Sequence, residues 1–424
     1  MSAIGNIEKL VWLLVSCCYL YQVYYIIYMI LKKREKEPVI KNNRINKFGI
    51  IISARNEEMV IGHLLDSINA QNYPSESVEI YVIADNCSEG DKTAEISRSK
   101  GANVVVRNRP DLVGKGYAID YLFSTMDENL NGCDAFIVLD ADNVLDKNYI
   151  AEMNKVFNRG YRVITSYRNS KNYGSNWISA GYSLWFMRES RYLNEARMNL
   201  NVSCAISGTG FLVHSDIIKS MGGWKYFLLT EDIEFTVDNV IKGEKIGYAK
   251  DAVLYDEQPV KFSQSWRQRM RWAKGFYQVM GNYGGKLAYN AFFKRNFSCF
   301  DMLMVIFPAV ILSIMCVFVF ALGVYDAIFI KSSWRILTYA IVPNFAQLSC
   351  FYLFMYSIGL ITTVSEWDSI NCSTGKKWLY TFTFPLYLAT QIPIAIVALF
   401  KKVEWKPISH TVVVTVDEIK KDEK

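Results

Sequence analysis

Short apolar runs that end in polar or charged residues recur in the first part of this 424-residue chain and constrain its fold more than any other feature. Four of these runs cover residues 48–53, 79–84, 104–107 and 135–139. Their length and composition are typical of strands that are buried on both faces of a parallel sheet. Helical patterns follow the first three runs, so strands alternate with helices. The sequence therefore predicts an α/β fold with a doubly wound, mainly parallel sheet.

Carboxylates stand directly after two of the predicted strands. Asp85 follows the second run, and Asp140 and Asp142 follow the fourth. Ligands of open α/β sheets bind beyond the carboxyl ends of the strands. Two carboxylates one residue apart can also hold a hard divalent cation against phosphate oxygens. These residues indicate a metal and diphosphate site, but Asp is common in turns as well, so the residues alone leave a structural role open.

Apolar residues are concentrated towards the two ends of the chain. Residues 7–31 form one apolar and aromatic run, and residues 297–400 are mostly apolar. Because runs of about 20 apolar residues are candidate transmembrane helices, we expect an N-terminal anchor and three later spans near 302–325, 336–362 and 379–400. Basic residues favour the cytoplasmic side of a span, and a cluster follows the first run: Lys32, Lys33, Arg34 and Lys36. The polar middle of the chain is therefore expected in the cytoplasm.

The cysteines, histidines and net charge exclude several classes of site. The nine cysteines include no C-x-x-C pair, and the three histidines, His63, His214 and His410, are not at ligand spacing to one another or to a cysteine. A zinc site or a disulfide framework is therefore not expected. The net charge of +6 is modest, and the basic residues gather beside the apolar runs. Lipid head groups explain this distribution better than nucleic acid does.

Two later segments combine small, hydroxylic or acidic residues. Small residues let a backbone and a substrate approach closely, and a series of them ends in Ser207, Gly208, Thr209 and Gly210. A tight turn between two short strands explains this series equally well. The second segment is Thr230-Glu231-Asp232, which opens a helical pattern. Thr230 would suit an N-cap and the acids would suit the helix dipole, so these residues also have an account without chemistry.

An amphipathic segment covers residues 263–280 and contains the motif Gln268-Arg269-Met270-Arg271-Trp272. Its basic and aromatic residues suit a helix that lies at a membrane surface. The same residues could clamp a diphosphate and stack on a sugar. Both roles can apply at once.

Taken in order, five motifs resemble those of the family-2 membrane glycosyltransferases of the processive β-glycan synthase type, which include cellulose, chitin, hyaluronan and poly-N-acetylglucosamine synthases. The motifs contain Asp85, Asp140-Ala141-Asp142, Ser207-Gly208-Thr209-Gly210, Thr230-Glu231-Asp232 and Gln268-Arg269-Met270-Arg271-Trp272. The resemblance covers residues 48–275 and implies a GT-A-like, doubly wound, mainly parallel sheet with N- and C-terminal transmembrane helices.

The resemblance also implies a division of the chain. Residues 1–34 would be the N-terminal anchor, 45–262 a cytosolic GT-A domain, 263–295 an interfacial amphipathic segment, and 296–403 a transmembrane region of about three spans. A tail covers 404–424. One span before the GT-A domain and three after it would put this tail outside, whereas nearby lysines favour the inside, and the sequence leaves its side open.

The family's functional residues map onto this chain by motif. Asp232 corresponds to the general base. The nucleotide and its diphosphate would be bound by Asp85, Lys115, Asp140, Gln268 and Arg271. The acceptor would be bound by Ser207, Gly208, Thr209, Glu231 and Trp272. Asp142, together with Asp140, would hold Mg²⁺ or Mn²⁺.

The resemblance implies an enzyme of the cell membrane with a cytoplasmic catalytic domain. It would transfer a hexose or N-acetylhexosamine from a UDP-sugar, with inversion, to a growing β-linked polysaccharide, and export the product. Its partners would be the UDP-sugar, a glycan or lipid acceptor, membrane lipids and possible export subunits. Two alternatives are the transfer of one sugar to a lipid, and an inactive membrane scaffold. The scaffold is disfavoured because the key residues are all present: Asp85, Asp142, Asp232 and Arg271.

Overall fold

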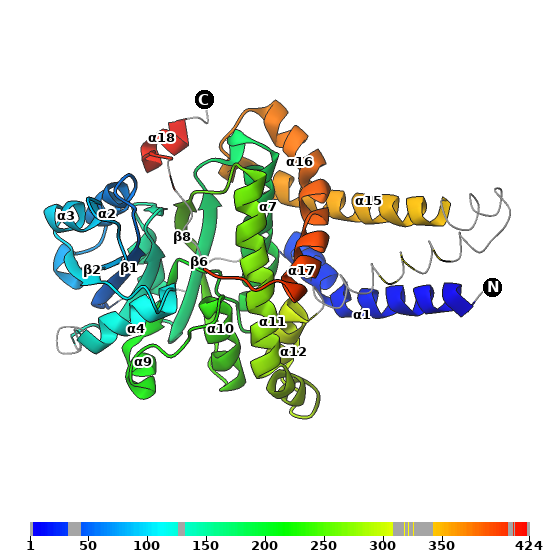
Figure 1. The fold of residues 1–424 in the computed structure, drawn as a ribbon, viewed down its shortest axis with the longest axis horizontal. Helices are drawn as coiled ribbons and strands as arrows, with labels where there is room; N and C mark the ends of the chain where they lie inside the picture. The colour runs from blue at the N-terminus through cyan, green and yellow to red at the C-terminus, as the bar shows by residue number, and fades with distance from the viewer. Residues whose placement is uncertain are drawn as a thin grey trace.

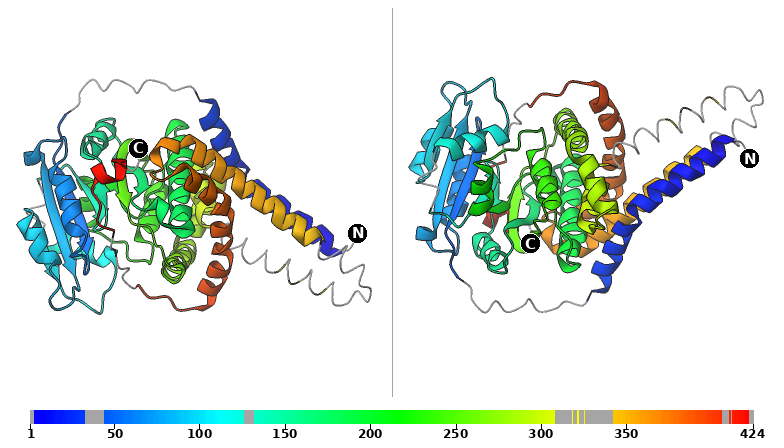
Figure 2. Two further views of the ribbon diagram at one scale, coloured as in Figure 1. Left: turned by 90° about the horizontal axis from the view of Figure 1, so that it is seen from above. Right: turned by 90° about the horizontal axis from the view of Figure 1, so that it is seen from below.

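The computed structural model describes residues 3–32, 44–125, 132–307, 342–405, 410 and 412–421, together with residues 318, 321 and 325. A central sheet lies between layers of helices, and two long helices, α1 (Ala3–Leu31) and α15 (Val342–Ser365), project in the same direction from one side (Figures 1 and 2). One face of the sheet packs against α2 (Ile61–Asn69) and α6 (Tyr149–Phe157), and the other packs mainly against α4 (Lys115–Thr125) and α10 (Glu231–Ile241). The α/β class predicted from the sequence is confirmed.

The described residues form an eight-stranded sheet in the order β3-β2-β1-β4-β7-β6-β8-β5. Its strands are β1 (Phe48–Ala54), β2 (Val78–Asp85), β3 (Asn103–Arg107), β4 (Ala135–Asp140), β5 (Val144–Leu145), β6 (Val163–Ser170), β7 (Phe211–His214) and β8 (Ile246–Asp256). The four runs singled out in the sequence form β1 to β4, which are mutually parallel. We call these four strands the parallel half of the sheet, and the other four the mixed half.

The prediction of a mainly parallel sheet needs a correction, because the sheet is mixed. β7 pairs antiparallel with both β4 and β6, and β5 pairs antiparallel with β8. The cause lies in the segment before β7, where the amide of Gly210 donates to the carbonyl oxygen of Val138 near the carboxyl end of β4. A strand that starts at this edge has to run back across the sheet.

The remaining helices lie around the sheet and at the base of the two projecting helices (Figure 1). They are α3 (Thr93–Ser99), α7 (Trp177–Arg188), α8 (Glu195–Asn199), α9 (Ser215–Met221), α11 (Phe262–Phe292), α12 (Phe297–Ile306), α16 (Thr374–Ala389), α17 (Gln391–Phe400) and α18 (Val416–Lys421). A π-helix, η3 (Glu189–Asn194), joins α7 to α8, and single 3₁₀ turns are η1 (Ser75–Ser77), η2 (Tyr173–Ser175) and η5 (Trp367–Ser369). The amphipathic segment predicted over 263–280 is part of the longer helix α11.

Two stretches within the described residues are long and apolar enough to cross a membrane, Leu348–Ser365 in α15 and Thr374–Phe400 in α16 and α17. The first predicted span, 7–31, falls in α1, where Cys18–Leu31 is a shorter apolar helix. The predicted span 302–325 lies mostly outside the described residues. α16 and α17 run across the bases of α1 and α15 and not alongside them (Figures 1 and 2). They pack on α7 and α11.

A buried ion pair ties α1 to the rest of the molecule. Both carboxylate oxygens of Asp301 on α12 accept from the Arg197 guanidinium, over 2.8 Å each. The hydroxyls of Tyr21 and Tyr25 on α1 donate to the same carboxylate, over 2.9 Å each. Because this carboxylate is fully buried, the two tyrosines provide donors that water cannot provide there.

Candidate functional site

A buried ion pair fixes the end of β2 at the carboxyl edge of the parallel half. Asp85 accepts a hydrogen bond from Nη1 of Arg107 over 2.5 Å. Nη2 of Arg107 donates to the carbonyl oxygen of Leu112. Burial raises the pKa of Asp85, and the charge of Arg107 opposes this rise without cancelling it. The edge thus holds the carboxylate of Asp85 in a fixed position.

Lys115, at the start of α4, links two parts of the site that are distant in sequence. Its Nζ donates to Oδ1 of Asp140 over 2.6 Å and to the carbonyl oxygen of Gly208 over 2.9 Å. A Cβ atom on Gly208 would lie 3.8 Å from Oδ2 of Asp232. Asp140 and Asp232 therefore border the same space. Gly208 has φ +78°, which a residue with a side chain would adopt only with strain.

Thr209 holds the end of β4 in place. Its Oγ1 accepts from the amide of Asp140 over 2.9 Å and donates to Oδ1 of Asn143 over 2.6 Å. The side chain is buried, so this hydroxyl is committed to the protein itself. In the segment predicted to contact the acceptor, Gly208 borders the open space and Thr209 faces inward.

Asp142 is buried at the same edge, beside groups that stabilise its charge. Its Oδ2 accepts from the amide of Glu257 over 2.9 Å and lies 3.9 Å from Nε2 of His410. Burial alone would raise the pKa of Asp142, but His410, Lys171 and the Glu257 amide together lower it. Asp142 is therefore an anion at neutral pH.

His410 brings the tail into the site, which the sequence analysis missed. Its Nδ1 lies 3.0 Å from Oε1 of Glu57, just after β1, and the amide of Val412 donates to Oε2 of Glu257 over 2.9 Å. Burial would lower the pKa of His410, but Asp142 and Glu57 raise it to about 10. A single histidine in a polar tail gives no sequence signal of such a position.

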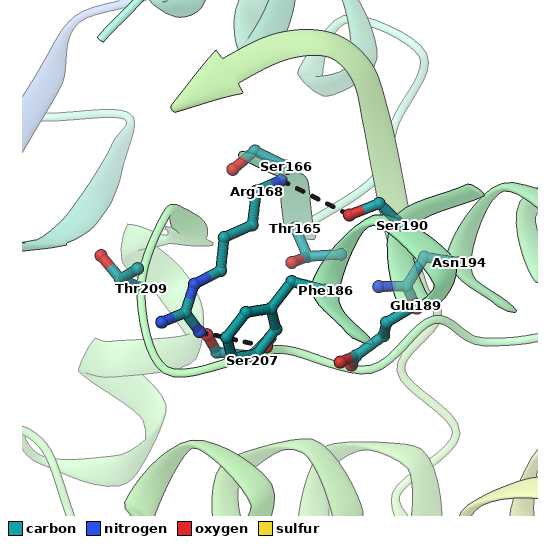
Figure 3. Close-up of a pocket in the computed structure, with 9 residues that line it drawn as sticks. All are labelled: Thr165, Ser166, Arg168, Phe186, Glu189, Ser190, Asn194, Ser207 and Thr209. Carbon is teal, nitrogen blue, oxygen red and sulfur yellow. Dashed lines mark hydrogen bonds between the residues drawn. The ribbon is translucent and has the colours of Figure 1, made fainter. Parts of the chain in front are cut away.

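Arg168 organises the mixed half of the site and was also missed. Its Nε donates to Oδ2 of Asp256 over 2.6 Å, and its Nη1 donates to the carbonyl oxygen of Ser207 over 2.8 Å. Figure 3 shows its guanidinium beside the ring of Phe186, 3.7 Å from the ring centroid. Arg168 lies near the end of β6, and Asp256 ends the neighbouring strand β8. The sequence does not indicate a strand at β8, so nothing in it pairs these two residues.

A small cavity lies behind the Ser207 segment and is lined almost entirely by polar side chains (Figure 3). Its one acidic residue is Glu189, the first residue of the π-helix. Burial raises the pKa of Glu189, although Arg197 and Arg168 oppose the rise. π-Helical turns are frequent at functional sites, and this one directs a carboxylate towards the region between Arg168 and Asp232.

Thr230, Glu231 and Asp232 begin helix α10, but helix capping does not account for Thr230. It occupies the N-cap position without a side-chain capping bond, and its buried Oγ1 has no hydrogen-bond partner among the described residues. Burial and the neighbouring Asp232 charge raise the pKa of Glu231 to about 7. Burial also raises the pKa of Asp232, against the charges of Arg271 and Lys115. A carboxylate with a raised pKa is a better proton acceptor at neutral pH.

Helix α11 lies directly against this segment because of one glycine. A Cβ atom on Gly275 would lie 2.4 Å from Oγ1 of Thr230, so any residue with a side chain would clash there. On the same helix, Nη1 of Arg271 donates to the carbonyl oxygen of Leu229 over 3.0 Å. The Oε1 atom of Gln268 is buried and has no hydrogen-bond partner among the described residues. Arg271 thus reaches the segment that precedes Asp232, and Gln268 carries an acceptor that no described residue uses.

The other cations of the motif face away from the site. Nη1 of Arg269 donates to the carbonyl oxygen of Tyr387, and Nζ of Lys274 donates to that of Ala398. Both bonds tie α11 to α16 and α17. Trp272 packs edge-on against Tyr182, with ring centroids 5.7 Å apart. Of the basic residues expected either to clamp a diphosphate or to contact a membrane, Arg271 is therefore the one beside the acids.

The residues at the edge fit a divalent cation only with help from a ligand. Within the part of the chain that the structure describes, no group of three or more Asp, Glu, His or Cys side chains could hold a metal ion alone. Asp142 is a buried anion whose charge is balanced by the protonated ring of His410, 3.9 Å away. Mg²⁺ commonly binds through one or two carboxylates plus substrate phosphates. The donor set suits that mode of binding.

Comparison with known proteins finds relatives that are named as sugar-transferring enzymes. The profile of a family described as "Glycosyltransferase like family 2" matches residues 46–275. The probable glycosyltransferase YdaM of Bacillus subtilis is 26% identical over 379 residues, which cover 84% of this chain and 83% of that protein. The β-monoglucosyldiacylglycerol synthase of Synechocystis is 23% identical over 235 residues, which cover 54% of this chain and 47% of that protein.

The fold also resembles that of a solved structure. The mannosyltransferase PcManGT from Pyrobaculum calidifontis, solved in complex with GDP-Man and Mn²⁺, superposes with a TM-score of 0.56. The match covers 93% of this chain and 99% of that one, at 14% sequence identity. At this identity the likeness supports the fold and not a shared substrate.

Proposed function

We propose a specific reaction for this chain, which belongs to glycosyltransferase-like family 2 and is a glycosyltransferase. It transfers a hexose or N-acetylhexosamine from a UDP-sugar, with inversion at the anomeric carbon. The acceptor is the end of a growing β-linked polysaccharide, which the enzyme extends at the cytoplasmic face of the cell membrane and exports. The two apolar stretches in α15 and in α16 and α17 support the membrane location.

The parallel half of the site would bind the donor. Asp85 would receive hydrogen bonds from the nucleobase, and Arg107 keeps its carboxylate oriented. Lys115 and Arg271 would stabilise the charge that grows on the diphosphate as the glycosidic bond breaks. Asp142 and Asp140 would hold Mg²⁺ or Mn²⁺. A bound divalent cation would neutralise the leaving diphosphate.

Asp232 would act as the general base. An acceptor hydroxyl is a weak nucleophile until its proton is removed, and a carboxylate with a raised pKa can accept that proton at neutral pH. Attack from the side opposite the diphosphate inverts the anomeric centre, so an α-linked donor gives a β-linked product. This needs one base and no covalent intermediate.

One observation supports this proposal most strongly. The contacts from Asp140 through Lys115 to Gly208 and on to Asp232 join the donor side of the pocket to the base, across more than 90 residues of sequence. A donor diphosphate beside Asp140 and an acceptor beside Asp232 would meet in one space. The buried, unpaired Oε1 of Gln268 adds a site for a ligand donor at its border.

A second candidate function is the transfer of one sugar to a lipid acceptor. The similarity to a monoglucosyldiacylglycerol synthase favours it. The chemistry at Asp232 is the same in both functions, so the acceptor alone separates them. The site would then receive a lipid hydroxyl from the membrane.

The first test uses the full-length protein in detergent with a panel of UDP-sugars, and measures released UDP with Mg²⁺, with Mn²⁺ and with a chelator. We expect turnover with one or two donors, a strong loss on chelation, and a decrease in kcat of roughly 10²- to 10⁴-fold in Asp232→Asn. Asp238→Asn is the control. It removes another carboxylate of the same helix, one that forms an ion pair with Lys242. Full turnover in Asp232→Asn would reject the assigned base.

The second test measures product length. Membranes that contain the protein are supplied with the preferred donor, and products are separated into polymer and organic-soluble lipid fractions. Polymer in the wild type supports the leading proposal. A single-sugar lipid as the sole product would reject processive synthesis and support the second candidate.

A further inference from the structure

The region from residue 258 to residue 300 contains eight Lys or Arg residues and no Asp or Glu. Lys261 and Arg267 are exposed near the start of α11, and the other six cations form two groups with different environments. Arg269, Arg271 and Lys274 are partly or fully buried and donate to backbone carbonyl oxygens. The other group, Lys286, Lys294 and Arg295, is exposed at the end of α11 and in the turn to α12. The positive charges of this second group therefore face solvent.

The turn also exposes large aromatic side chains. The exposed fractions are 61% for Phe292, 78% for Phe293 and 45% for Phe297, and Tyr289 on the preceding helical turn is 55% exposed. Phe292 and Phe297 border an open hollow of about 320 Å³, which Ala291, Arg295 and Phe300 complete. Soluble surfaces rarely gather this much aromatic area without a partner. We call Lys286, Tyr289 and residues 292–297 the basic-aromatic corner.

The basic-aromatic corner lies at the base of α1. The ring of Tyr21 on α1 makes edge-to-face contacts with Phe297 and Phe300, at centroid distances of 6.1 Å and 5.7 Å. α1 and α15 project from this side of the molecule (Figure 1). If these helices enter a bilayer, as the proposed function requires, the corner is at the level where they enter.

No ion pair or side-chain hydrogen bond of Lys286, Lys294 or Arg295 joins them to other described residues, and the acidic group close to them in sequence, Asp301, is buried and bonded to Arg197. Lys294 instead lies over the ring of Tyr289, at 5.8 Å from its centroid. Aromatic rings at the depth of the head groups and cations facing lipid phosphates are the features of protein segments that bind anionic membrane surfaces.

We propose that the basic-aromatic corner docks on the anionic phospholipid head groups of the bilayer, with its phenylalanines inserted at the interface and its three cations against lipid phosphates. This assigns the membrane contact to the far end of α11 and not to the Q-R-M-R-W segment, whose outward cations bind α16 and α17. The proposal rests on the membrane location given in the proposed function, but not on the identity of the donor or acceptor.

The test compares full-length protein in nanodiscs of phosphatidylcholine alone with nanodiscs that contain about 30% phosphatidylglycerol, and follows hydrogen exchange of peptides covering residues 284–300. The attraction of anionic lipid for each nearby cation changes the membrane-bound fraction of a segment by roughly fivefold. We therefore expect at least fivefold slower exchange in the turn when phosphatidylglycerol is present. Released UDP is measured separately, in detergent, so that activity and docking are read independently.

Three variants sharpen this test. The charge reversals Lys286→Glu, Lys294→Glu and Arg295→Glu, combined, should abolish the dependence on phosphatidylglycerol and leave detergent activity unchanged. The matched control reverses three exposed cations on α9 and at α3, Lys92→Glu, Arg98→Glu and Lys219→Glu, and should keep the dependence. Phe293→Ser, at the most exposed ring of the corner, should speed exchange in both nanodisc types.

Equal exchange of the turn in both lipid compositions would overturn the proposal, as would a dependence that survives the corner reversals or is lost in the control. Failure of the protein to enter nanodiscs at all would count against the proposed membrane location itself. A protein that enters nanodiscs and releases UDP but shows no protection at the corner would reject this inference alone.

Discussion

The two halves of the sheet build their parts of the site in different ways. In the parallel half, Asp85 and Asp140 are the last residues of strands, so the strand itself positions each carboxylate. In the mixed half, Arg168 is held by an ion pair across two strands, and Asp232 begins a helix. The proposed donor contacts of Asp85 and Asp140 thus come from local geometry, whereas those of Arg271 and the proposed base Asp232 depend on long-range packing. The two halves therefore support the proposed site in different ways.

The largest effect that tests this comparison is expected from the buried pair in the parallel half. Arg107→Met leaves Asp85 buried without its partner, which should lower the free energy of unfolding by about 3–5 kcal/mol. Denaturant titration in detergent measures it. The double variant Asp85→Asn with Arg107→Met removes both charges and should recover part of the loss. A single variant as stable as the wild type would show that this half does not depend on the pair.

The next effect separates binding from chemistry. Asp85→Asn should raise the KM for the donor about 10- to 100-fold while kcat changes little, because hydrogen bonds to a charged group contribute about 1.5–3 kcal/mol. Initial rates of UDP release over a donor concentration series give both constants. Asp111→Asn, on a fully exposed side chain near the same edge, is the control. A fall in kcat with an unchanged KM would break the division between the halves.

A third prediction concerns the packing that supports the base. Gly275→Ala places a Cβ atom 2.4 Å from Oγ1 of Thr230 and should cost about 1–3 kcal/mol of stability through overpacking, with lower kcat because the start of α10 moves. Gly281→Ala is the matched control in the same helix, since nothing lies within 4 Å of its Cβ position. It should be neutral or slightly stabilising. Thermal unfolding and UDP release are measured for both.

The smallest effect is a pH dependence. Because the pKa of Glu231 is raised to about 7 and that of Asp232 is also raised, part of this pair is protonated at neutral pH. A base works only when deprotonated, so kcat/KM should rise with pH as this pair of acids loses its proton. In Glu231→Gln the like charge is gone, and the acid limb should shift to lower pH. An unchanged pH profile would argue against coupling between these acids.

The parallel half could be predicted from the sequence because its signals are local. Each apolar run and the acid after it lie within a few residues, so β1 to β4, Asp85 and Asp140 follow from pattern alone. In the mixed half, a strand can be predicted near β6 from residues 161–167, but the pairing and direction of the strands cannot. β7 has four residues, and its direction depends on where the preceding segment crosses the sheet.

The site residues that were missed share the same cause. Arg168 and Asp256 meet only because β6 and β8 pair, and His410 meets Glu57 across most of the chain. Nothing near these residues in sequence indicates a site. The sequence indicates that the Q-R-M-R-W segment could bind a diphosphate or contact a membrane, but it does not divide these roles among the cations. Arg269 and Arg271 are only two positions apart. The packing of α11 places Arg269 against Tyr387 and Arg271 against Leu229.

The buried carboxylate of Asp301 has a practical consequence for anyone who trims the molecule. A shortened chain that begins near β1 would remove the hydroxyls of Tyr21 and Tyr25 and leave Arg197 as the remaining donor to that carboxylate. It would also uncover the apolar residues that pack under α1, among them Leu193 and Ala196. Such a truncation is expected to aggregate, so α1 belongs to the folding unit of the catalytic part and is more than a tether.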